Sequence, residues 1–228
     1  MRRKKTVLIL AGGKSQRFQF KPLQGLRVSP SWTCGGAGGA RDGTEHYNKC
    51  FFTINNKPLI QYVIDRISSV ADEIIVAARD RKQEEQIRDK TSNKIVLVFD
   101  SLHDFGPLAG FQSGLKRASF PYSLVIGCDM PFVNERVVEF LFEIASTGYN
   151  AVVPRWENGL IEPLHAVYRK EPMLIAIKEA AKRGEGKIFT VLSQLKKVYF
   201  LPINEIREID PSLKTFTNIN TAEELWLQ

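Results

Sequence analysis

The sequence contains no hydrophobic run long enough to cross a lipid bilayer. Its longest apolar runs, such as 6–11 and 123–126, fall far short of the about 18 residues that a membrane-spanning helix needs. The N-terminus is basic, but the apolar stretch after it ends at Gly12 and Gly13, sooner than the about 7 to 15 residues of a signal peptide. We therefore expect no membrane contact and a cytoplasmic location.

Cysteine is also scarce. The three cysteines, Cys34, Cys50 and Cys128, are too few for a disulfide framework in 228 residues, and no Cys-x-x-Cys pair indicates a zinc site. This usage fits a reducing compartment. Cys128 has no histidine near it in the sequence that would activate its thiol, so we expect a small buried residue there.

A dense block of basic residues is absent as well. The 32 lysines and arginines exceed the 25 aspartates and glutamates, giving a net charge of +7, but they are spread along the chain. Scattered charge is typical of a solvated surface, so we expect no nucleic acid partner. The positive excess suits phosphorylated small molecules. The sequence leaves open whether the chain forms a homo-oligomer.

Short β-rich apolar runs alternate with helical patterns, which predicts βαβ units. We expect an α/β fold with a Rossmann-like, doubly wound, mostly parallel sheet. Because one α/β domain can reach about 250 residues, we expect a single domain over 1–228. The expected strands are 6–10, 73–77, 94–99, 123–126, 151–154 and 198–201, and the expected helices are 58–67, 81–90, 108–117, 133–145, 171–182 and one from 221.

The segment 19–47 does not follow this alternation. It holds six of the 16 glycines and shows neither a strand nor a helix period. Long loops of this kind inside compact domains are functional lids or disordered insertions. We expect a mobile insertion.

The first expected strand ends in Leu10 and Ala11 and continues into Gly12 and Gly13. Ligands of α/β sheets bind beyond the carboxyl ends of the strands, where glycines let backbone N–H groups approach a phosphate. Neither GxxxxGK[ST] nor GxGxxG is present, and a Gly-Gly pair alone is more often a tight turn. Two cations in the same segment, Lys14 and Arg17, favour a triphosphate site over ordinary surface charge.

Two aspartates each follow an expected strand. Asp100 comes after 94–99, ahead of Gly-Pro-Leu-Ala-Gly at 106–110, and Asp129 follows 123–126 through Gly127 and Cys128. We expect these strands to be adjacent and parallel, so that the two carboxylates converge at one edge of the sheet. Mg²⁺ is typically held by one or two carboxylates together with substrate phosphates, so the pair predicts a magnesium and nucleotide site. His165 begins an apolar run, where a structurally satisfied histidine is expected.

The motifs together resemble molybdenum cofactor guanylyltransferase, the MobA family. They cover nearly the whole chain in order. They are Leu-Ala-Gly-Gly-Lys-Ser-x-Arg-Phe at 10–18, Lys49 before Asn-Lys-Pro-Leu-Ile at 56–60, Asp100-Ser-Leu, Gly-Pro-Leu-Ala-Gly at 106–110, Cys-Asp-Met-Pro at 128–131, Glu-Pro-Leu-His at 162–165 and Asn-Ile-Asn-Thr at 218–221.

The resemblance implies transfer of GMP from GTP to molybdopterin with release of pyrophosphate and with Mg²⁺ as cofactor. It implies a nucleotide-diphospho-sugar transferase-like fold. The residues that it assigns to the nucleotide are Leu10, Ala11, Gly12, Gly13, Lys14, Lys49, Asp100 and Asp129. Those assigned to catalysis are Asp129, Lys49 and Arg17, and Asp129 is also the expected metal ligand.

Two departures from the family pattern leave alternatives open. The segment 19–47 intervenes before Lys49, and Ala77 stands where the family has an asparagine that would contact guanine or ribose. One alternative is a related nucleotidyltransferase that uses CTP or another phosphorylated acceptor. The other is a non-catalytic adaptor that only binds a nucleotide.

Overall fold

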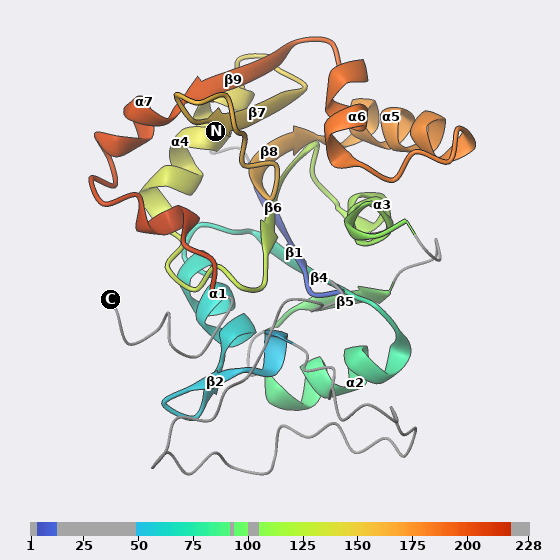
Figure 1. Cartoon of the computed structure of the whole chain (residues 1–228). Helices are drawn as coiled ribbons and strands as arrows, with labels where there is room; N and C mark the ends of the chain where they lie inside the picture. The colour runs from blue at the N-terminus through green and yellow to red at the C-terminus, as the bar shows by residue number, and fades with distance from the viewer. Residues whose placement is uncertain (1–3, 13–48, 92–93, 100–104, 220–228) are drawn as a thin grey trace, which may run out of the picture.

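A computed structural model describes residues 4–12, 49–91, 94–99 and 105–219 (Figure 1). The expected insertion at 19–47 and the expected helix from 221 lie outside these ranges. The described residues form one central sheet with helices on both of its faces.

The central sheet has seven strands in the order β5-β4-β1-β6-β8-β7-β9. Every pairing is parallel except those of β8, which runs antiparallel to both β6 and β7. The predicted α/β fold with a mostly parallel sheet is therefore confirmed. The strands are β1 (Thr6–Leu10), β4 (Glu73–Ala78), β5 (Val96–Phe99), β6 (Tyr122–Gly127), β7 (Ala151–Arg155), β8 (His165–Arg169) and β9 (Val198–Pro202), and a separate small hairpin pairs β2 (Thr53–Ile54) with β3 (Lys57–Pro58).

Two of the described helices, α2 and α4, begin at a side chain that caps them. Asp80 accepts a hydrogen bond from the backbone N–H of Gln83, and Asn134 accepts one from that of Arg136. No helix in these ranges is long and apolar enough to cross a membrane. The helices are α1 (Leu59–Ile67), α2 (Arg81–Lys90), α3 (Pro107–Arg117), α4 (Glu135–Ala145), α5 (Lys170–Lys182), α6 (Ile188–Gln194) and α7 (Ile203–Arg207), with 3₁₀ turns η2 (Lys49–Phe51) and η3 (Lys214–Phe216).

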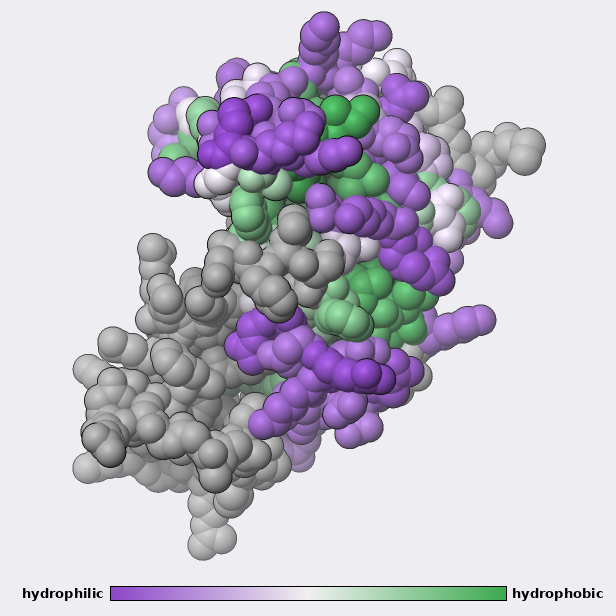
Figure 2. Space-filling model, turned by 90° about the vertical axis from the view of Figure 1, so that its right-hand side faces the viewer, coloured by the Kyte–Doolittle hydropathy of each residue, from purple (hydrophilic) through white to green (hydrophobic). Residues whose placement is uncertain are grey.

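Two hydrophobic cores lie on opposite faces of the sheet because successive side chains of a strand point to opposite sides. In β1, Val7 and Ile9 enter the core under α1, α2, α4 and α7, whereas Leu8 enters the core under α3, α5 and α6. Figure 2 views the face with α3, α5 and α6, whose surface is largely hydrophilic with a band of hydrophobic atoms across its middle.

The structure corrects one expectation about strand order. The strands that precede Asp100 and Asp129 are β5 and β6, and β4 and β1 lie between them. Three strand steps of about 4.8 Å separate these two strands by about 14 Å. The prediction that the two aspartates follow neighbouring strands is therefore wrong, because hydrophobic periodicity identifies strands without giving their order in the sheet.

The antiparallel direction of β8 determines where the chain turns after β7. Because β7 runs parallel to β9 and in the same direction as β6, its carboxyl end lies at the same edge of the sheet as that of β1. Residues 156–164 return the chain from this edge into β8. They form a hairpin closed by the backbone N–H of Trp156 on the carbonyl of Leu160 at 2.8 Å.

Close packing of α3 on β1 depends on Gly114. A methyl group at this position would overlap the side chain of Leu8, which is fully buried. Alanine favours a helix by up to about 1 kcal/mol over glycine, whereas overpacking a core costs about 1 to 3 kcal/mol. We expect Gly114→Ala to lower the free energy of unfolding by about 1 kcal/mol or more, measured by urea denaturation.

The exposed residue Lys116 on the same helix supplies the control, and Lys116→Ala should change stability by less than about 0.5 kcal/mol. A Gly114→Ala protein as stable as the wild type would show that α3 shifts freely on the sheet.

Candidate functional site

The segment after β1 leaves the sheet between two parallel neighbours. The backbone N–H of Ala11 donates to the carbonyl of Ala77 at the end of β4, at 2.9 Å. On the other side, the backbone N–H of Cys128 after β6 donates to the carbonyl of Leu10 at 3.3 Å. Leu10, Ala11 and Gly12 are therefore held at the carboxyl edge of the sheet, where ligands of α/β folds bind.

The carbonyl of Ala11 is fixed from two further elements. Gln83 Nε2 donates to this oxygen at 2.8 Å, and Cys50 Sγ lies 3.2 Å from it. Gln83 is buried, and its Oε1 accepts a hydrogen bond from the backbone N–H of Arg79 at 2.7 Å. One side-chain amide thus joins α2 to the segment after β1 and fixes the direction of the Ala11 peptide group.

Sequence reasoning missed Gln83 because it lies in a charged helix that reads as solvent-exposed. A signal was nevertheless present: Asp80 is followed three residues later by Gln83, the spacing of a capping box. The cap itself forms, since Asp80 Oδ1 accepts from the backbone N–H of Gln83 at 2.8 Å. The spacing does not reveal that the side-chain amide of Gln83 also bonds the carbonyl of Ala11.

Two buried thiols fill the space beside this segment. The Sγ atoms of Cys50 and Cys128 lie 3.0 Å apart, and neither cysteine forms a disulfide. The contact with Cys50 and burial raise the pKa of the Cys128 thiol. The thiol stays protonated and unreactive at neutral pH, which confirms the prediction of a small buried residue at this position.

Lys49 and Asp129 meet at the same edge. Lys49 Nζ lies 3.3 Å from Asp129 Oδ2, and the two side chains keep 17% and 24% of their surface exposed. The Asp129 carbonyl accepts from the backbone N–H of Ile219 at 2.9 Å, and a Cβ at Gly127 would lie only 2.5 Å from Asp129 Oδ1. The Asp129 carboxylate therefore lies against Gly127, a position that has no space for a side chain.

The structure thus brings together Leu10, Ala11, Gly12, Lys49 and Asp129 of the residues predicted from the sequence. Gly13, Lys14, Arg17 and Asp100 lie outside the described residues.

One carboxylate is available to a metal ion at this edge. Within the described ranges, no group of three or more histidine, cysteine, aspartate or glutamate side chains could enclose a metal. Mg²⁺ does not need such a cage, because it is commonly bound through one or two carboxylates plus substrate phosphates. The partly exposed carboxylate of Asp129 fits that requirement.

The side chain of Ala77 is part of the hydrophobic core. Its methyl group is buried in the cluster that contains Leu8, Leu108 and Phe111, and only its carbonyl, through Ala11, belongs to the site. The side chain at this position therefore offers no polar contact to a ligand.

His165 is buried behind the edge, at the start of β8. Its Nε2 lies 3.2 Å from Thr215 Oγ1, and its ring packs edge-on against Phe216 with centroids 4.9 Å apart. Its Nδ1 is buried without a hydrogen-bond partner among the described residues. The prediction of a structurally satisfied histidine therefore holds only for Nε2. Burial lowers the pKa of His165 to about 3, which keeps the ring neutral.

The chain is similar to known proteins over most of its length. The model of the family described as MobA-like NTP transferase domain matches residues 7–198. A probable molybdenum cofactor guanylyltransferase of Methanosarcina mazei is 41% identical over 193 residues, covering 83% of this chain and 85% of the relative. One from Methanosarcina acetivorans is 37% identical over 216 residues, covering 92% and 94%.

A solved structure is also similar over almost its full length. It is the molybdopterin-guanine dinucleotide biosynthesis protein A of Archaeoglobus fulgidus, with a TM-score of 0.73, 26% identity and coverage of 97% of this chain and 95% of that one. The matched residues include the end of β1, Lys49 and Asp129. The chain therefore belongs to the family of MobA-like NTP transferase domains.

Proposed function

We propose that this chain transfers GMP from GTP to molybdopterin, with release of pyrophosphate and with Mg²⁺ as cofactor. The observation that carries the proposal is the Lys49–Asp129 pair at the sheet edge, next to the segment fixed after β1. Relatives whose names describe molybdenum cofactor guanylyltransferases support the choice of GTP and of the acceptor.

The segment after β1 binds the nucleotide through its backbone. Gln83 and Cys50 hold the Ala11 carbonyl inside the protein. Gly12 is only half-buried there, so its backbone can approach a ligand without a Cβ in the way. In this proposal Gly13, Lys14, Arg17 and Asp100 extend the nucleotide site, with Lys14 and Arg17 on the β- and γ-phosphates.

Lys49 and Asp129 act where the phosphoryl group is transferred. Asp129 would hold Mg²⁺, which would supply charge neutralisation at the α-phosphate. Lys49, 3.3 Å from the same carboxylate, places a positive charge beside the phosphates that leave as pyrophosphate. No protein nucleophile takes part: the acceptor phosphate attacks the α-phosphorus in line, and the protein contributes position and charge.

The direct test is product analysis. We expect the protein, incubated with molybdopterin, Mg²⁺ and each nucleoside triphosphate in turn, to release pyrophosphate and form the dinucleotide with GTP, detected by mass spectrometry. GTP should also stabilise the protein most, by about 2.7 kcal/mol at a hundredfold excess over its dissociation constant.

The other outcomes correspond to the alternatives that the sequence leaves open. A preference for CTP would contradict the guanylyl assignment, and binding of GTP without product would indicate a non-catalytic adaptor.

Replacing Asp129 tests the metal ligand. Asp129→Asn keeps the size of the side chain and removes its charge, so we expect turnover to fall about a hundredfold or more while the fold is kept. Product formation is measured together with a circular dichroism melt. Asp89→Asn, a change at an exposed carboxylate on α2, should leave turnover unchanged. Normal turnover in a folded Asp129→Asn protein would exclude this role and make Asp100 the leading candidate.

Replacing Gln83 tests how the nucleotide segment is positioned. Gln83→Met keeps the length of the side chain but leaves the Ala11 carbonyl without its amide donor, which costs about 1 to 3 kcal/mol. We expect the KM for GTP to rise about tenfold, with a smaller change in kcat, in steady-state kinetics below the melting temperature.

Gln112→Met is the matched control, because Gln112 is also a buried amide on a helix but accepts its hydrogen bond from Lys116 of its own helix. An unchanged KM for GTP in Gln83→Met would show that the other contacts of the segment suffice.

A further inference from the structure

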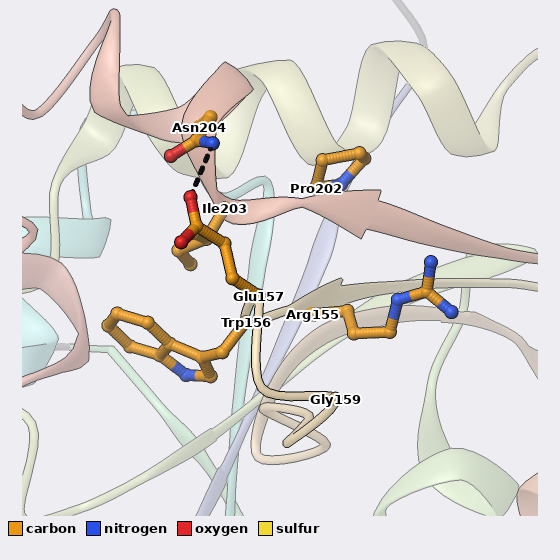
Figure 3. A pocket seen from close by; sticks show the side chains of 7 residues that line it. All are labelled: Arg155, Trp156, Glu157, Gly159, Pro202, Ile203 and Asn204. Atoms are coloured by element: carbon orange, nitrogen blue, oxygen red, sulfur yellow. Dashed lines mark hydrogen bonds between the residues drawn. The ribbon is translucent and has the colours of Figure 1, made fainter.

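A second feature of the carboxyl edge is a pocket of about 340 Å³ (Figure 3). It lies between the hairpin 156–164 and the junction of β9 with α7, away from Lys49 and Asp129. Its volume is within the range of small-molecule sites, about 300 to 1,000 Å³. None of its lining residues takes part in the site described above.

The sheet topology places this pocket on the side where the reaction is proposed to occur. β7 and β9 end at the same edge as β1 and β6, and they lie two and three strand positions from β6. At a spacing of about 4.8 Å, the pocket is about 10 to 14 Å along the edge from the strand that precedes Asp129. The pocket and Asp129 therefore lie along the same edge of the sheet.

The walls combine apolar and polar groups. Trp156, Pro202 and Ile203 provide the apolar lining. Glu157 and Asn204 point toward each other from the hairpin and from α7, and Asn204 Nδ2 donates to Glu157 Oε1 at 2.8 Å. Glu157 Oε2 has no partner among the described residues, so one carboxylate oxygen is ready to accept a hydrogen bond.

Two contacts fix the position of the Trp156 ring. Trp156 Nε1 donates to Glu162 Oε1 at 2.7 Å, and the Trp156 ring packs edge-on against Phe216 with centroids 5.8 Å apart. A ligand ring that packs on Trp156 therefore meets a side chain whose position is already fixed, which lowers the entropy cost of binding.

We propose that this pocket binds the ring system of the acceptor, a 2-amino-4-oxopteridine, with Glu157 and Asn204 as its polar contacts. The assignment rests on the proposed function. The pyrimidine edge of such a ring presents an amino group and a ring N–H, from which Glu157 Oε2 can accept a hydrogen bond. The carbonyl next to them can accept one from the second N–H of the Asn204 amide. Trp156 and Ile203 pack on the ring.

Guanine carries the same amino, N–H and carbonyl edge, so the test separates the two rings. Binding of 6-hydroxymethylpterin to the full chain is measured by equilibrium dialysis with saturating GTP present, and KM values for GTP and molybdopterin are measured in parallel. We expect Glu157→Gln to weaken pterin binding and to raise the KM for molybdopterin, each about tenfold, with the KM for GTP unchanged. Asn204→Ala should act in the same direction.

Glu208→Gln, a change at an exposed glutamate just after α7, is the matched control and should alter none of these values. Unchanged pterin binding in Glu157→Gln, or an equal rise in the KM for GTP, would overturn the assignment. A wild-type protein that binds pterin but forms no product would instead contradict the proposed function and leave the pocket assigned.

Discussion

The central position of β1 is the constraint on which the site depends. β1 has a parallel neighbour on each side, and Val7, Leu8 and Ile9 are fully buried between the two cores. Its backbone therefore has no freedom to shift, and the residues after it emerge at one fixed point of the edge. The turn with Lys49, the helix with Gln83 and the end of β6 all attach to that point.

Small side chains make this junction possible. Cys50 and Cys128 are buried beside Ala11, and Gly127 leaves space for the carboxylate of Asp129. Larger residues here would push Asp129 away from Lys49. The thiols contribute size and weak hydrogen bonds, and the raised pKa of the Cys128 thiol keeps that thiol from acting as a nucleophile. The charged pair is the part of the junction that faces solvent.

Much of this arrangement was predictable from the sequence, because it follows from local pattern. Apolar periodicity placed most strands of the central sheet and most helices, and glycines after the first strand marked the edge where ligands bind. The pairing of Lys49 with Asp129 could not come from spacing, because 80 residues separate them. The resemblance to a family gave each of the two residues a role at the nucleotide but did not predict that they pair.

Features that depend on contacts between distant segments were missed or predicted wrongly. The amide of Gln83 reaches Ala11, 72 residues away, and no periodicity reports such a contact. Two strands separate β5 from β6, because sheet order is set by how the helices pack across both faces. The Nδ1 atom of His165 lacks a partner among the residues that the structure describes, which the apolar run around it did not reveal.

The reversed direction of β8 has a consequence for how such a protein can diversify. A parallel strand in its place would require a crossover between β7 and β8, whereas an antiparallel one needs only the hairpin 156–164. Hairpins lengthen or change sequence at small cost in loop-closure entropy. Residues on this hairpin can therefore vary among descendants of one ancestor while β1 and its neighbours keep their register. Ligand binding at the hairpin can then evolve separately from ligand binding at the segment after β1.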